Sequence, residues 1–116
     1  MSRSASADLE ELVTYIRQDS PQNARKVVED IHKNVERLRR FPRSGETDPG
    51  APPMHGEMEA RIVRASGFLI RYAFPVRRGA GRDVVYVVSI QRAGRLPLDD
   101  TDYMLRFLQE AAGVYA

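Results

Sequence analysis

The spacing of apolar residues changes midway along this chain, and this change constrains the fold more than any other feature. Between residues 7 and 40, apolar side chains recur every three or four positions, which predicts amphipathic α-helices. Between residues 60 and 92, they alternate with other residues or form short apolar runs, which predicts β-strands. A stretch rich in Pro and Gly, residues 41–56, separates the two parts. The chain is therefore expected to belong to the α+β class.

The helical part reads as two helices with a short connection. The first spans about residues 7–18, and the second begins at Ser20-Pro21, where serine suits the N-cap and proline the first helical position. The second helix is expected to end near Arg39-Arg40, because Pro42 cannot continue it. Two helices joined so closely predict an antiparallel hairpin, whose apolar stripes need a further partner.

Three strands are expected to supply that partner as a small antiparallel sheet. They cover residues 60–65, residues 68–74 after a turn at Gly67, and residues 83–91. The last of these strands is apolar on both faces, which predicts a central position in the sheet. The helical hairpin is then expected to pack on one face of the sheet.

A third helix is predicted after the sheet. Asp99, Asp100 and Thr101 offer N-caps for it. The residues expected on its buried side are Met104, Leu105, Leu108 and Ala112. With 116 residues, the chain is predicted to form a single domain that contains the hairpin (7–40), the sheet (60–92) and the C-terminal helix (100–113).

Positive charge is concentrated in the β-rich half. Residues 61–95 hold eight arginines and a single acid, Asp83, whereas the whole chain has a net charge of only +2. Such asymmetry is typical of a surface that meets an anionic partner, either nucleic acid or an acidic protein. The alternative is a solvent-exposed sheet face on which the arginines have no binding role.

Several function classes are disfavoured by what the sequence lacks. Without cysteine there are no disulfides and no thiol chemistry, and no Gly-rich phosphate loop leads from a strand into a helix. No apolar run approaches the roughly 18–20 residues that cross a bilayer, and no signal peptide is recognisable. A cytoplasmic protein without a membrane partner is expected. His32 and His55 are read as surface or loop residues, so we expect neither a metal site nor a cofactor.

Five arginines are the candidate binding residues, because guanidinium stays charged and can hold phosphate or carboxylate with two hydrogen bonds. Arg71 alternates with apolar residues, so it is expected to point away from the helices. The set comprises Arg61, Arg64, Arg71, Arg92 and Arg95. Arg92 and Arg95 lie at the end of the final predicted strand, where a ligand can reach them. The three arginines within residues 77–82 lie in a predicted hairpin tip and are expected to serve solubility.

In order and spacing, these segments resemble the RelE/ParE family of toxins from type II toxin–antitoxin modules, which are also labelled plasmid stabilisation proteins. The resemblance spans about residues 7–96. The matching segments are residues 7–12 with Tyr15-Ile16, Ser20-Pro21, Phe41-Pro42-Arg43-Ser44-Gly45, residues 67–72 and residues 87–95.

The resemblance implies a small cytoplasmic toxin that a cognate antitoxin neutralises by wrapping around it with helices and an extended segment. The ParE-like branch inhibits DNA gyrase by protein binding, and the RelE-like branch cleaves messenger RNA on the ribosome. The long helical hairpin and the Phe-Pro-x-x-Gly junction favour the ParE-like branch. An inactive relative that only binds an antitoxin is a third alternative.

The end of the last strand bears on the same choice. Many relatives carry His-Gly-x-Arg there, whereas this chain has Arg92-Ala93-Gly94-Arg95. Arginine can neutralise a phosphate but stays protonated, so it is a poor proton shuttle. The ribonuclease hypothesis is thereby weakened. Its candidate catalytic residues would be Arg92, Arg95 and Tyr72.

The family also opens with a β-strand before the first helix, but residues 1–7 are too short and polar to form one. Either the start is truncated or the sheet lacks this edge strand. An open sheet edge would favour pairing with a second copy of the chain or with the antitoxin. The C-terminal helix is a candidate to cover the vacated surface.

Overall fold

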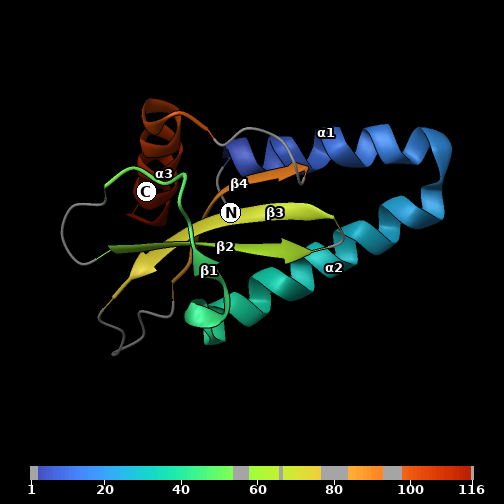
Figure 1. Ribbon diagram of the computed structural model, residues 1–116. Coiled ribbons are helices and arrows are strands. Elements are labelled where there is room, and N and C mark those ends of the chain that lie inside the picture. Colours follow the sequence, from blue (N-terminus) through green and yellow to red (C-terminus); the bar gives the residue numbers. More distant parts are fainter. Residues whose placement is uncertain (1–2, 54–57, 66, 77–83, 93–97, 116) are drawn as a thin grey trace.

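The computed structural model describes residues 3–53, 58–65, 67–76, 84–92 and 98–115. Along these residues, a pair of long helices is followed by a four-stranded antiparallel sheet and a C-terminal helix (Figure 1). The α+β fold that the sequence predicts is confirmed. Within the described residues, none of the helices is both long and apolar enough to cross a membrane.

The helical hairpin consists of α1 (Arg3–Asp19) and α2 (Pro21–Arg40). Ser20 has an extended backbone, and its Oγ accepts a hydrogen bond from the Asn23 N–H at 3.3 Å. Pro21 occupies the first helical position, so the predicted start of the second helix is confirmed. Helix α1 begins at Arg3, four residues before the predicted start. The described residues accordingly hold no strand before α1.

A short segment between the hairpin and the sheet was not expected from the sequence. The 3-10 helix η1 (Pro42–Ser44) is followed by β1 (Glu46–Thr47), which pairs with the next strand through only two residues. A strand of two residues is too short to show an alternating pattern, and this one lies within the stretch that reads as a loop. It nevertheless fixes residues 44–50 against the sheet edge.

The sheet has the order β1-β2-β3-β4, with β2 (Met58–Ala65), β3 (Phe68–Pro75) and β4 (Tyr86–Arg92) all antiparallel to their neighbours. Gly67 has a φ of 81°, a conformation that glycine adopts without strain, and it forms part of the predicted turn between β2 and β3. The prediction of a central position for the last strand is wrong, because β4 pairs only with β3 among the described strands.

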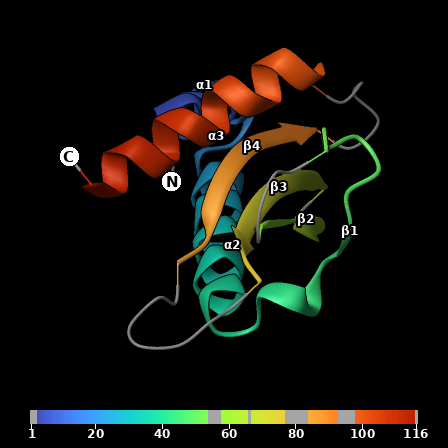
Figure 2. The same ribbon diagram turned by 90° about the vertical axis from the view of Figure 1, so that its left-hand side faces the viewer.

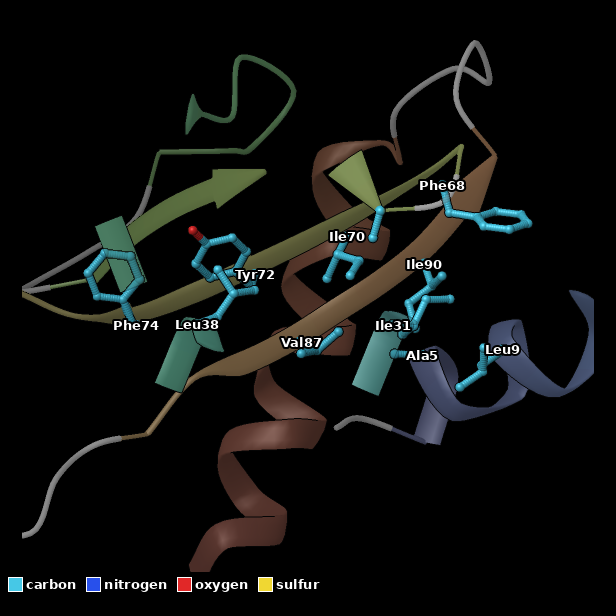
Figure 3. Close-up of a cluster of buried hydrophobic side chains, with 11 residues drawn as sticks. Ala5, Leu9, Ile31, Leu38, Phe68, Ile70, Tyr72, Phe74, Val87 and Ile90 are labelled. Atoms are coloured by element: carbon cyan, nitrogen blue, oxygen red, sulfur yellow. The ribbon is translucent and has the colours of Figure 1, made fainter. Parts of the chain in front are cut away.

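The hydrophobic core lies between the sheet and the hairpin (Figure 3). Phe68, Ile70, Tyr72 and Phe74 alternate along β3 and are all buried on the face that α1 and α2 cover. Ile31 and Leu38 of α2, together with Leu9 of α1, meet them there. The predicted apolar face of β3 is thereby confirmed, and the opposite face of the sheet is left for other contacts.

The outer edge of β4 is covered by helices rather than by a strand. The Asp8 carboxylate on α1 accepts a hydrogen bond from the backbone N–H of Ile90 at 3.2 Å. The same Oδ2 atom receives a bond from Arg106 Nη1 of α3 (Asp100–Tyr115) at 2.8 Å. Both helices pack on β4, so this strand is buried although it is an edge (Figure 2). This burial explains why its sequence resembles that of a central strand.

The face of helix α3 that is buried against the rest of the protein differs from the face that the sequence predicts. Tyr103 is completely buried, and the Phe107 ring meets the Tyr86 ring edge-on at a centroid distance of 5.5 Å. Leu105 and Leu108, which were expected to be buried, are each 54% exposed. The aromatic contacts and the Arg106–Asp8 ion pair set the rotation of the helix, and helical periodicity alone does not reveal them.

Candidate functional site

Strand register decides which of the candidate arginines lie together. Arg64 is opposite Leu69 and Ile62 is opposite Arg71, so these four side chains share the face of the sheet that points away from the hairpin. Arg61 is opposite Tyr72 and lies on the other face, toward η1. The predicted outward orientation of Arg71 is therefore observed, but the five arginines do not form one continuous surface.

Arg71 is not exposed to a ligand. Its side chain is 5% exposed, and its Nη1 donates to Oδ1 of Asp48, a carboxylate that is completely buried. The same Oδ1 accepts the backbone N–H of Gly50 at 2.9 Å, which holds the segment after β1 in place. Arg71 Nε also reaches Gln91 Oε1 at 3.4 Å. In this structure, Arg71 connects β3, β4 and the segment after β1.

Arg61 is also engaged within the protein. Its Nη1 donates to the backbone oxygen of Gly45 at 2.7 Å, and its Nη2 lies 3.4 Å from Glu59 Oε1. Glu59 in turn contacts Arg43, whose guanidinium stacks over the Phe74 ring at 5.6 Å from its centroid. These contacts hold η1 against the sheet and leave little of the Arg61 charge for a partner.

Tyr72 forms a clamp at the same place. Its hydroxyl donates to the backbone oxygen of Pro42 at 2.6 Å and accepts the backbone N–H of Gly45 at 3.1 Å. The side chain is completely buried, and this desolvation raises the pKa of Tyr72, although the hydrogen bond from Gly45 opposes the rise. The hydroxyl is buried and already engaged both as a hydrogen-bond donor and as an acceptor, so it has no access to a substrate in this structure.

Burial of Tyr72 and Tyr103 predicts loss of stability in alkali. Desolvation raises the pKa of both phenols above the usual value of about 10, and for Tyr103 the nearby Asp48 adds to the rise. Above that pH the unfolded chain releases protons that the folded chain retains, so the free energy of unfolding should fall as pH rises.

Absorbance at 295 nm measures this effect directly. Tyr72 and Tyr103 should ionise only as the protein unfolds, and Tyr103→Phe should remove one of these late steps. The variant should also lose less stability than the wild type in alkali. A titration in which no tyrosine ionises later than the rest, while circular dichroism still reports a folded chain, would contradict this prediction.

Arg64 differs from Arg61 and Arg71, because it is exposed and its side chain forms no ion pair with another described residue. It borders a cleft of about 450 Å³ on the outer face of the sheet. It is lined by residues 44–47, 49 and 50 on one side and by Ile62 and Leu69 of the sheet. Glu46 also lines the cleft, so its charge is mixed. The cleft can take a partner segment with an anionic group near Arg64.

The remaining candidates lie at the end of β4. Arg92 is exposed and opposite Phe68, at the end of the sheet where β3 begins. Arg95 lies outside the described residues, as do His55 and the arginines of the predicted hairpin tip. Among the described residues, no group of three or more His, Asp or Glu side chains is placed to hold a metal ion.

Sequence reasoning missed the acidic partners of the arginines. Asp48 lies 23 residues from Arg71, in a segment that reads as a loop, and Asp8 lies 98 residues from Arg106. No periodic pattern links such pairs. One sequence signal was available: an arginine within the apolar strand β3 requires a counter-charge if both faces of the sheet are covered.

Comparison with known proteins identifies the family. The model for the ParE toxin of the type II toxin–antitoxin system, parDE, matches residues 1–97. No curated protein and no solved structure matches the chain. The matched residues include the hairpin and the whole sheet, whereas α3 lies beyond them. The chain belongs to the ParE toxin family of type II toxin–antitoxin systems.

Proposed function

We propose that this protein is a toxin that inhibits DNA gyrase by protein binding and is neutralised by a cognate antitoxin in the cytoplasm. The observation that carries the proposal is the match to the ParE toxin model over residues 1–97. The state of the candidate residues supports it. Arg61, Arg71 and Tyr72 are engaged in structural contacts, so a surface for binding is better supported than an active site for proton transfer.

The outer-face cleft is the proposed contact for the antitoxin. Arg64 presents an exposed cation beside the half-buried side chains of Ile62 and Leu69. An extended segment with one carboxylate and one apolar side chain would match this combination. Arg92 offers a second exposed cation at the end of β4. Arg64 and Arg71 at this cleft stay protonated, so neither can act as the base in cleavage of RNA.

The proposal predicts that the purified protein inhibits gyrase. Supercoiling of relaxed plasmid by gyrase should fall as the protein is added, and the antitoxin encoded beside it should restore supercoiling. Translation of a reporter message in a purified system should continue at the same protein concentration. Full supercoiling at a large excess of protein would contradict the gyrase assignment, and cleavage of ribosome-bound message would favour the ribonuclease alternative.

A matched pair of variants addresses the cleft in the same assay. Arg64→Glu reverses an exposed charge at the cleft, and Arg25→Glu reverses an exposed charge on α2. Only Arg64→Glu should weaken rescue by the antitoxin, by about tenfold or more. Equal rescue of both variants would show that the antitoxin does not use the cleft.

A further inference from the structure

Large apolar side chains are exposed at a few positions of the described chain, and three of them lie on surfaces of opposite charge. Phe41 at the end of α2 is 63% exposed, and Leu105 and Leu108 on α3 are each 54% exposed. Neither surface takes part in the hydrophobic core or in the outer-face cleft. Exposed apolar groups beside charged ones are common features of protein interfaces.

Phe41 borders a basic hollow at the C-terminal end of α2. The hollow has a volume of about 490 Å³ and is lined by His32, Lys33, Glu36, Arg37, Arg40 and Phe41. Its one acid, Glu36, already forms an ion pair with Arg39 at 3.2 Å. The hollow combines this exposed aromatic ring with Lys33, Arg37 and Arg40, and aromatic and arginine side chains are enriched at protein interfaces.

Helix α3 carries the complementary surface, which we call the α3 strip: Asp102, Leu105 and Leu108. These residues are all exposed and follow one another at three-residue spacing on one side of the helix. Helix α3 and the two residues before it contain the four acids Asp99, Asp100, Asp102 and Glu110. Its one base, Arg106, is engaged with Asp8. The two leucines of the α3 strip are therefore exposed apolar side chains within an acidic surrounding.

One chain cannot bring these two surfaces together. Figures 1 and 2 show α3 and the C-terminal end of α2 well apart in the molecule, with the sheet between them. Both helices are held in place, α3 through Tyr103 and Phe107 and α2 through Ile31 and Leu38. Contact between the two surfaces therefore requires two molecules.

We infer that the α3 strip of one copy docks into the basic hollow of a second copy, with Leu105 and Leu108 against Phe41. The acids of α3 would face Lys33 and Arg37, neither of which forms an ion pair with another described residue. Because the two surfaces differ, the contact is heterologous: two molecules can form it reciprocally, or it can continue along a chain of copies. This inference does not depend on the identity of the toxin's target.

Sedimentation of the full chain tests the inference. The wild type should associate in the micromolar range, and added salt should weaken association because opposite charges meet. Phe41→Glu and the double variant Leu105→Glu/Leu108→Glu should each weaken association at least about tenfold. Val76→Glu is the matched control, since Val76 is 42% exposed and lies on neither surface. Unchanged circular dichroism would show that each variant is folded.

Mixing the two defective variants tests whether the surfaces are complementary. The Phe41→Glu protein keeps an intact α3 strip, and the Leu105→Glu/Leu108→Glu protein keeps an intact hollow. Their mixture should form a one-to-one heterodimer at least about tenfold more tightly than either variant associates with itself. A wild type that stays monomeric would overturn the inference, even if the hollow then bound an acidic segment of another protein. A mixture that fails to associate would overturn it as well.

Discussion

Replacing Arg71 with methionine is expected to lower the free energy of unfolding by about 3–5 kcal/mol, because it leaves the carboxylate of Asp48 buried without its counter-charge. Asp48 is completely buried and Arg71 is 5% exposed, so water cannot replace the missing partner. Asp48→Asn should be similarly costly, since it leaves the guanidinium unpaired. Urea denaturation followed by circular dichroism measures both effects.

A double-mutant cycle separates the ion pair from the packing around it. Arg71→Met/Asp48→Asn removes both charges, and asparagine can still accept the Gly50 N–H. The double variant should therefore lose much less stability than the sum of the two single variants. Arg64→Met, on the exposed part of the same face, should change stability by less than about 0.5 kcal/mol. If each single variant loses less than about 1 kcal/mol and the double variant loses the sum of the two, the ion pair contributes little to stability.

This prediction also affects how toxicity is interpreted. Arg71 is one of the candidate binding residues from the sequence, and a variant that destroys its ion pair would reduce toxicity by unfolding the protein. Loss of toxicity in such a variant does not by itself identify a binding residue. Arg64 is the more informative position, because its side chain is exposed and its replacement is expected to leave the fold intact.

The second large effect is expected from Gly45→Ala. A Cβ atom at residue 45 would lie 2.5 Å from the Tyr72 hydroxyl and 2.6 Å from the backbone oxygen of Ile62. Overpacking of this kind costs about 1–3 kcal/mol, and separating η1 from the sheet would also strain the bonds of Tyr72 and Arg61. A total loss of about 3 kcal/mol or more is expected, measured by thermal or urea unfolding.

Two comparison variants define the cause of this loss. Gly67→Ala places a Cβ in open space, so its cost should come only from its left-handed backbone, about 1 kcal/mol. Tyr72→Phe removes one of the two clashes at residue 45, so Gly45→Ala should cost less in that background than in the wild type. The same cost in both backgrounds would show that the tyrosine hydroxyl is not the obstacle.

Much of the fold could be predicted because its signals are local. The apolar spacing in α1 and α2, the Ser20-Pro21 junction and the alternation along β3 each depend on neighbouring residues. The rotation of α3 could not be predicted in this way. Leu105 and Leu108 form an apolar stripe as regular as any in the chain, but contacts of Tyr103 and Phe107 with distant strands decide which side is buried.

The candidate site was predicted less well for a related reason. Strand alternation correctly predicted that Arg71 points away from the helices, since successive side chains of a strand point to opposite faces. The sequence does not show that Arg71 pairs with Asp48 or that Arg61 donates to the backbone oxygen of Gly45. Those contacts depend on the path of residues 42–50 over the sheet. A cluster of cations in the sequence therefore overstates the positive charge that a partner meets.

The bond between Asp8 and the Ile90 N–H, shared with Arg106, has a consequence for biosynthesis. These contacts join residues separated by 82 and 98 positions. Asp8 can therefore form both of them only after almost the entire chain has been synthesised. During translation the hairpin can form early, while the part of β4 that α3 covers stays open until α3 has emerged from the ribosome. Completion of the fold is therefore tied to synthesis of the last helix, and the nascent toxin passes through a stage in which a partner could still reach that strand.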